Sequence, residues 1–204
     1  TTTTTTTKGM SSATPSLHDA CRAGKLDQVR SIIARSTGAV DAKATDGSGD
    51  TPMHLACRGG HDDVVRYLMT EAGDQVSTDV TIQNKAGRTI LHEACESKNV
   101  VMVAFLMELD QINANAVINV GNQYGNTPLH DACRRGHKDI VECLIDANSS
   151  AVDVDSQNEH GMTPFHFACG NHRMEVVKYL VESDHITINP NTRNLNGKTP
   201  FHDA

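Results

Sequence analysis

The tetrapeptide Thr51-Pro52-Met53-His54 decides the fold, because close copies of it recur along the whole chain. Copies begin at Thr89, Thr127, Thr163 and Thr199, and a weaker one begins at Pro15. The motif histidines lie at positions 18, 54, 92, 130, 166 and 202, so successive steps are 36, 38, 38, 36 and 36 residues. A near-constant period of this length indicates a stack of structural repeats rather than one globular core.

One period, residues 46–72, encodes two short helices. Thr51 suits the N-cap position and Pro52 the first helical position, so a helix is predicted to start there. Gly60 can adopt the left-handed conformation that ends a helix. A second helix is predicted from about Asp62, because apolar residues follow it at helical spacing. These residues are Val64, Val65, Leu68 and Met69.

Two helices joined by a turn, with a glycine-containing hairpin tip before each motif, closely resemble the ankyrin repeat from Pro15 to Ala204. The resemblance implies an all-α repeat solenoid: paired antiparallel helices with β-hairpin fingers. Residues 1–13, with their threonine run, are expected to be a disordered low-complexity tail or a cloning remnant. The array itself is expected at 14–204. Its units, numbered one to six, are 14–45, 46–83, 84–121, 122–157, 158–193 and a partial 194–204.

The resemblance also gives the motif histidines an architectural role. His54, His92, His130 and His166 are expected to hydrogen-bond within their own helix start and to the neighbouring unit. A cysteine follows three residues after each of five motif histidines, which raises the alternative of a zinc site. Such a site needs four converging donors, whereas neighbouring pairs are expected about 10 Å apart. The structural role is therefore preferred, and no metal or cofactor is expected.

Two kinds of departure from the family pattern matter. Lys98 and His172 occupy the slot that Gly60 fills in unit two, and a left-handed conformation would cost each about 1–2 kcal/mol. Ile90 also replaces the motif proline, so units three and five are predicted to open first. The second departure is a longer period. The extra residues alternate apolar and polar side chains, as in Val80-Thr81-Ile82 and Val152-Asp153-Val154, and predict a short strand entering each finger.

Composition limits the functions available to the chain. The net charge of −7 disfavours nucleic acid as a partner, and no apolar run is long enough to expect direct membrane insertion. The repeated cysteines are expected to be free and buried, because repeat spacing exceeds the reach of a disulfide. Free thiols favour a reducing compartment, so a cytoplasmic protein is expected, with the nucleus as an alternative, and not a secreted one.

Nothing in the sequence predicts catalysis, since the repeated thiols are expected in the core and no glycine-rich loop has the form that cradles phosphate. The resemblance instead implies a non-catalytic protein–protein interaction module, a scaffold or adaptor. Its partner would contact the fingertips and the exposed positions of the first helices. Carried over by position, the candidate residues are Arg58, Lys85, Arg88, Tyr124, Asn126, Arg134, Arg135, His160, Met162 and Leu195.

Arginine and lysine dominate this candidate set, so the expected partner is an acidic or acidic-apolar protein segment. An alternative is that the array is a targeting or autoinhibitory arm of an enzyme or channel encoded outside this chain. The sequence stops at Ala204, inside the first helix of unit six. Further repeats, or end-to-end self-association through this uncovered unit, are therefore expected.

Overall fold

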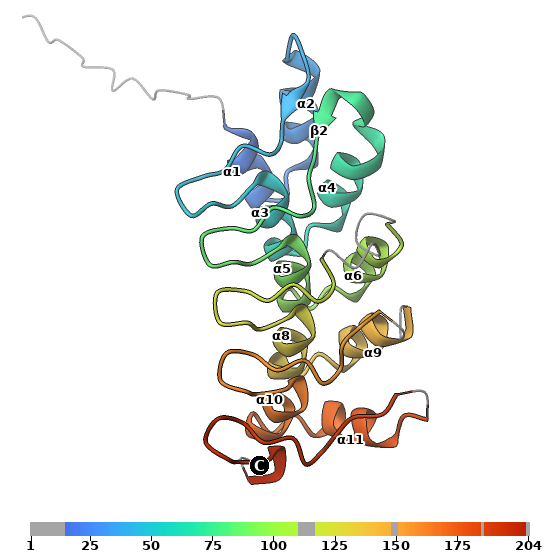
Figure 1. The fold of residues 1–204 in the computed structure, drawn as a ribbon. Coiled ribbons are helices and arrows are strands. Elements are labelled where there is room, and N and C mark those ends of the chain that lie inside the picture. Colours follow the sequence, from blue (N-terminus) through green and yellow to red (C-terminus); the bar gives the residue numbers. More distant parts are fainter. Residues whose placement is uncertain (1–14, 110–116, 148–150, 185, 203–204) are drawn as a thin grey trace, which may run out of the picture.

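The computed structural model describes residues 15–109, 117–147, 151–184 and 186–202, and it shows an elongated row of helix pairs (Figure 1). The predicted tail at 1–13 lies outside the described residues. The first helix of each unit stands in one column, the inner helices. These are α1 (Leu17–Arg22), α3 (Pro52–Gly59), α5 (Ile90–Glu96), α8 (Pro128–Arg135), α10 (Pro164–Gly170) and the 3-10 turn η3 (Pro200–His202).

The second helices form a parallel column, the outer helices. They are α2 (Leu26–Arg35), α4 (Asp62–Arg66), α6 (Val100–Met107), α9 (Lys138–Ala147) and α11 (Met174–Glu182). A π-helical turn, η1 (Tyr67–Glu71), extends α4, and a 3-10 turn, η2 (Gly73–Gln75), follows it. From α1 to α10, each inner helix packs against its own outer helix, and neighbouring inner helices, including η3, pack against one another. The predicted all-α repeat solenoid is confirmed.

The motif threonine and histidine form a reciprocal cap at the start of an inner helix. In unit two, Thr51 Oγ1 accepts the backbone N–H of His54 at 3.3 Å, and His54 Nδ1 accepts the backbone N–H of Thr51 at 3.3 Å. Two of the unpaired N–H groups at the helix start are thereby satisfied. Because Nδ1 accepts, Nε2 carries the proton and donates to the carbonyl oxygen of Arg88, in the next unit, at 3.0 Å.

The same link to the following unit recurs along the row. Nε2 of His92 lies 2.8 Å from the carbonyl oxygen of Asn126, and Nε2 of His130 lies 2.9 Å from that of Met162. His166 makes the corresponding contact at 3.2 Å. The architectural role expected for these histidines is confirmed.

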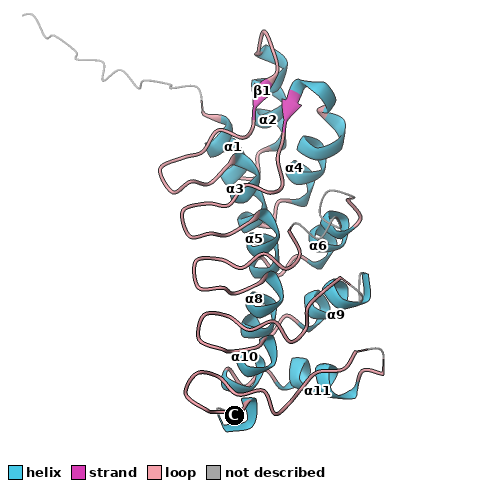
Figure 2. Cartoon of the chain, in the orientation of Figure 1, coloured by secondary structure: helices cyan, strands magenta, loops and turns pink. Residues whose placement is uncertain are grey.

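The strand prediction is wrong. Val80 and Thr81 lie in a turn, and the described residues of the equivalent segments are turn or loop (Figure 2). The cause is local: Asp79 accepts the backbone N–H of Thr81, and Asp153 accepts that of Asp155, which bends the chain at the expected strand. Within the described residues, strands occur instead at β1 (Val40–Asp41) and β2 (Val76–Ser77), which pair in parallel.

The fingers themselves are tight turns closed by a few backbone bonds. In the unit-three finger, the N–H of Asn84 donates to the carbonyl oxygen of Arg88 at 2.9 Å, and the N–H of Gly87 donates to that of Asn84 at 2.8 Å. Gly87 has a φ of 72°, the left-handed conformation that this turn requires. Figure 2 shows the fingers as loops, so they are tight turns rather than the expected β-hairpins.

The predicted left-handed conformations at Lys98 and His172 are confirmed. Their φ angles are 65° and 54°, while Gly60 and Gly136 occupy the same slot at 70° and 77°. A side chain with a Cβ is strained there, and glycine is not. Units three and five therefore each contain a strained helix end that units two and four lack.

Replacing Lys98 with glycine is expected to raise the free energy of unfolding by about 1 kcal/mol, because relief of left-handed strain outweighs the added backbone entropy of glycine. Gly60→Lys is the matched reverse change, since a Cβ at Gly60 would meet no atom closer than 3.7 Å. It should lower stability by a similar amount. Urea denaturation measures both, and a neutral or destabilising K98G would contradict the strain.

Acid should destabilise the stack through its buried histidines. Burial lowers the pKa of His92 and of His130 to about 4 each, from an ordinary value of 6.5. The stability that depends on the neutral rings is present above pH 6.5 and is lost as pH falls towards 4, by about 3 kcal/mol for each ring. We expect denaturation at a series of pH values to show this slope. His92→Gln should reduce this slope by about one proton.

Candidate functional site

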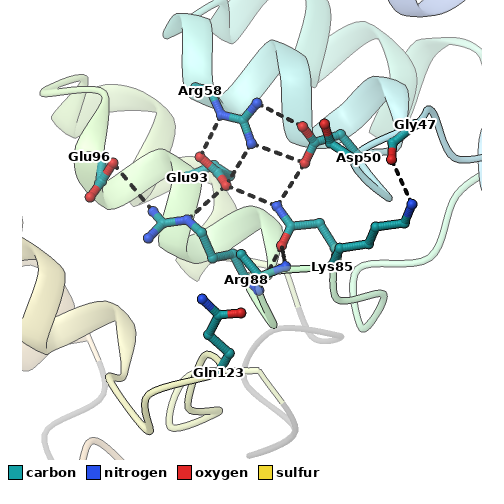
Figure 3. Close-up of a pocket in the computed structure, with 11 residues that line it drawn as sticks. Gly47, Asp50, Arg58, Lys85, Arg88, Glu93, Glu96 and Gln123 are labelled. Carbon is teal, nitrogen blue, oxygen red and sulfur yellow. Dashed lines mark hydrogen bonds and ion pairs between the residues drawn. The ribbon is translucent and has the colours of Figure 1, made fainter.

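A hollow of about 670 Å³ lies between the fingers and the inner helices of units two to four (Figure 3). Its finger side is lined by Gly47, Ser48, Lys85, Ala86 and Gln123. Its inner-helix side is lined by charged side chains and one amide: Asp50, Arg58, Asn84, Arg88, Glu93 and Glu96. This hollow contains most of the ionic contacts on the finger side of the row, so it is the natural candidate site.

Arg58 joins two carboxylates from adjacent units. Its NH1 and NH2 donate to the two oxygens of Asp50 at 2.7 and 3.0 Å. Its Nε and NH2 donate to the two oxygens of Glu93 at 2.9 Å each. Asn84 adds a hydrogen bond to Asp50 at 2.7 Å. The contacts of Arg58 with Asp50 and with Glu93 are both bidentate, which is the strongest geometry available to a guanidinium.

Arg88 carries the contacts on to unit four. Its Nε donates to Glu93 at 2.8 Å, and its NH1 donates to Asp131 at 2.9 Å. Its NH2 donates to the carbonyl oxygen of His92 at 3.1 Å and lies 3.5 Å from Glu96. The Arg88 side chain is only 15% exposed, so it is embedded among these groups rather than presented to solvent.

Glu96 gathers two further arginines from the end of α8. Arg134 NH2 bonds to Glu96 and lies 3.5 Å from Asp131, and Arg135 NH2 lies 3.3 Å from Glu96. We call the complete set the charged cluster. Its members are Asp50, Arg58, Arg88, Glu93, Glu96, Asp131, Arg134 and Arg135. Four arginines face four carboxylates, so the cluster carries no net charge.

The carboxylates lie beneath the arginines. Asp50, Glu93 and Asp131 are 3%, 2% and 3% exposed, whereas Arg58 is 45% exposed. Burial alone would raise the pKa of Glu93, but hydrogen bonds from Arg58 and the charge of Arg88 outweigh it and hold that pKa below its ordinary value. Asp131 differs, since burial, assisted by Glu96, raises its pKa to about 6 against the opposing arginines. Asp131 is therefore the least compensated carboxylate of the cluster.

A ladder of backbone hydrogen bonds aligns the fingertips above this cluster. The N–H of Lys85 donates to Ser48 at 3.0 Å, and the N–H of Gln123 donates to Ala86 at 2.9 Å. The next two rungs run from Glu159 to Tyr124 at 3.0 Å and from Leu195 to His160 at 2.9 Å. The tips of consecutive units are thus held in a fixed row.

The predicted site residues fall into two groups. Arg58, Arg88, Arg134 and Arg135 belong to the charged cluster, and Lys85 Nζ donates to the carbonyl oxygen of Gly47 at 2.7 Å. The rest lie along units four to six. Tyr124 and Leu195 are 53% and 77% exposed, and His160 is exposed as well. Met162 is half-buried, and the Asn126 side chain accepts a hydrogen bond from Asn158 at 2.7 Å.

The buried carboxylates of the cluster, Asp50, Glu93 and Asp131, were missed by the sequence prediction. Glu93 and Asp131 directly follow the motif histidine, in the slot that Leu55 and Phe167 occupy in other units. A carboxylate at a position that is apolar in other units is expected to be buried, and a buried carboxylate needs a cationic partner. This pattern in the sequence could have revealed the cluster. The surface predicted to be basic is consequently balanced.

The His-x-x-Cys pairs do not converge as zinc ligands would. Both ring nitrogens of His54 are occupied, by Thr51 and by the carbonyl oxygen of Arg88. Burial raises the pKa of the Cys57 thiol, which keeps it protonated. Among the described residues, no three His, Cys, Asp or Glu side chains are grouped to hold a metal ion. No helix in that part of the chain is long and apolar enough to cross a membrane.

Comparison with known families matches this chain to the one described as Ankyrin repeats (3 copies). The matches span residues 17–117, 75–153 and 148–204, and together they cover nearly all of the array.

Comparison with individual proteins finds shorter likenesses. Protein phosphatase 1 regulatory subunit 27 from Homo sapiens is 35% identical over 62 residues, which are 30% of this chain and 38% of that protein. Its counterpart from Mus musculus is 36% identical over 59 residues, or 29% and 36%. Osteoclast-stimulating factor 1 from Gallus gallus is 36% identical over 56 residues, or 28% and 26%. Each likeness spans less than half of either protein.

Replacing Glu93 with glutamine tests whether the cluster stabilises the array. The change leaves Arg58 and Arg88 without their shared buried anion, so we expect a loss on the order of 3 kcal/mol in the free energy of unfolding. Glu142→Gln is the control, because it removes a carboxylate from the solvent-facing Lys138–Glu142 pair and should change stability only slightly. Equal effects of the two variants in urea denaturation would show that the cluster contributes nothing special.

Proposed function

Because the chain belongs to the ankyrin repeat family, we propose that it is a non-catalytic protein–protein interaction module, a regulatory scaffold or adaptor. The fingertips and the inner-helix face beneath them bind the partner. The observation that carries this proposal is the fingertip ladder from Lys85 to Leu195. A surface held in one arrangement before binding loses little conformational entropy when a partner docks on it.

The side chains at these tips support the same assignment. Tyr124 and Leu195 expose more than half of their surface although they are large and apolar. Aromatic side chains are enriched among the residues that dominate binding energy. The charge balance of the cluster argues against a strongly acidic partner, because Arg58, Arg88 and Arg134 already have carboxylate partners. A partner of low net charge fits the face better.

A second candidate is that the array is the regulatory or targeting arm of an enzyme or channel. It is favoured by the likeness to two proteins named as regulatory subunits of protein phosphatase 1. The catalytic subunit of that phosphatase is the first defined protein to test against the purified array. Binding would support the regulatory candidate, and failure to bind would remove this phosphatase as its target.

Two further expectations belong to this proposal. The cysteines are free thiols, which supports a reducing compartment such as the cytoplasm. The second expectation is end-to-end association through the last unit, where Val181 in α11 and Phe201 in η3 expose large apolar side chains.

Affinity capture tests the binding face directly. The variant Y124A/L195A removes two exposed apolar side chains from the fingertips, and V101A/M174A removes two that are also more than half exposed from the outer helices. Partners should be retained by the wild-type array and by V101A/M174A but depleted at least tenfold by Y124A/L195A, because tip contacts carry the binding energy. Quantitative mass spectrometry of the captured proteins makes the comparison. Identical capture by all three chains would place the partner elsewhere.

A further inference from the structure

Arg58 differs from the other arginines of the cluster in what it leaves exposed. A guanidinium has five N–H groups, and four of those on Arg58 donate to Asp50 and Glu93. The edge formed by Nε and NH2 is closed by Glu93, and the edge formed by NH1 and NH2 is closed by Asp50. Arg58 nevertheless lines the hollow and is 45% exposed. What it presents to the hollow is therefore mainly its flat face.

A flat guanidinium face selects a different ligand from a free guanidinium edge. A free edge binds carboxylate or phosphate through paired hydrogen bonds, whereas the face stacks on aromatic rings. A partner carboxylate at Arg58 would find both edges closed. It would also approach Asp50 and Glu93, which are held ionised below the arginine. An aromatic ring meets neither obstacle.

The chain already uses this contact elsewhere between its own units. The guanidinium carbon of Arg66 lies 4.3 Å from the ring centre of Phe105, and that of Arg30 lies 5.1 Å from that of Tyr67. Both distances are within the range of a cation–π interaction. In both pairs, an arginine on an outer helix is covered by a ring of the following unit. No ring from the described residues covers Arg58 in this way.

We propose that the hollow is a subsite for an aromatic side chain of the bound partner, which stacks on the exposed face of Arg58. This inference rests on the proposed function, and it specifies which kind of partner side chain binds at Arg58. The hollow has the volume of an ordinary ligand pocket, so a tyrosine or tryptophan ring fits in it. Lys85 and Gln123 stand at its finger side, where they can contact the ring edge or the partner backbone (Figure 3).

The test uses the full chain, labelled with ¹⁵N, and N-acetyl-tryptophanamide as the probe. We expect saturable shifts in the NMR signals of the Arg58 Nε–H and of the backbone amides of Ala86 and Gln123. N-acetyl-aspartate amide, an acidic probe of similar backbone, should leave those signals in place. The proposal is overturned if the aromatic probe shifts none of them, or if the acidic probe shifts them as strongly.

Two variants locate the contact. Arg58→Lys keeps the charge but lacks a planar face. It should therefore weaken the affinity for the aromatic probe at least fivefold, as measured from the amide signals of Ala86 and Gln123. Arg30→Lys is the control, because Arg30 is similarly exposed, at 49%, but lies on the outer helix α2 and does not line the hollow. It should leave the affinity unchanged. The wild-type titration needs no variant, so it decides the question even if R58K unfolds.

The outcome is separable from that of the proposed function. If the aromatic probe fails while Y124A/L195A still loses the captured partners, only the aromatic subsite is rejected. If the probe binds at Arg58 while Y124A/L195A captures partners normally, the subsite is supported and the fingertips are not the binding surface.

Discussion

The buried motif histidine is the interaction on which the row of units depends. One ring nitrogen completes the cap of its own helix, and the other reaches a carbonyl oxygen of the next unit, as His54 does with Arg88. A single side chain therefore fixes where a helix begins and where its neighbour stands. Both contacts need a neutral, buried ring. Folding of the array is therefore coupled to the protonation state of the motif histidines.

The periodic part of the structure was readable from the sequence. The helix starts, the left-handed slot and the two columns of helices all follow from local rules that each unit repeats. The failure at Val80 and Val152 has a local cause as well, because the aspartate beside each of them forms a turn that competes with a strand. Alternation of apolar and polar residues could not reveal this competition, since it reports burial rather than backbone direction.

Only part of the candidate site could be predicted from the sequence. Exposure of Tyr124 and Leu195 at the tips follows from the family pattern, and the structure agrees. The pairing of Arg58 with Glu93 could not be foreseen in the same way, because the two residues lie 35 positions apart and in different units. A count of charged residues predicted on a surface treats each charged side chain as unpaired. In the folded array the carboxylates lie below the arginines, so the surface presents guanidinium groups without presenting a net positive charge.

The charged cluster also constrains how this sequence can drift. Its three most buried carboxylates and the arginines above them come from three successive units, and each arginine except Arg135 contacts more than one carboxylate. Loss of Arg58 or Arg88 deprives a carboxylate that is only 2–3% exposed of a cationic partner. Positions 58, 88, 93 and 131 are consequently expected to change together or not at all among descendants of this gene, so that substitutions at one of them become visible as correlated substitutions at the others.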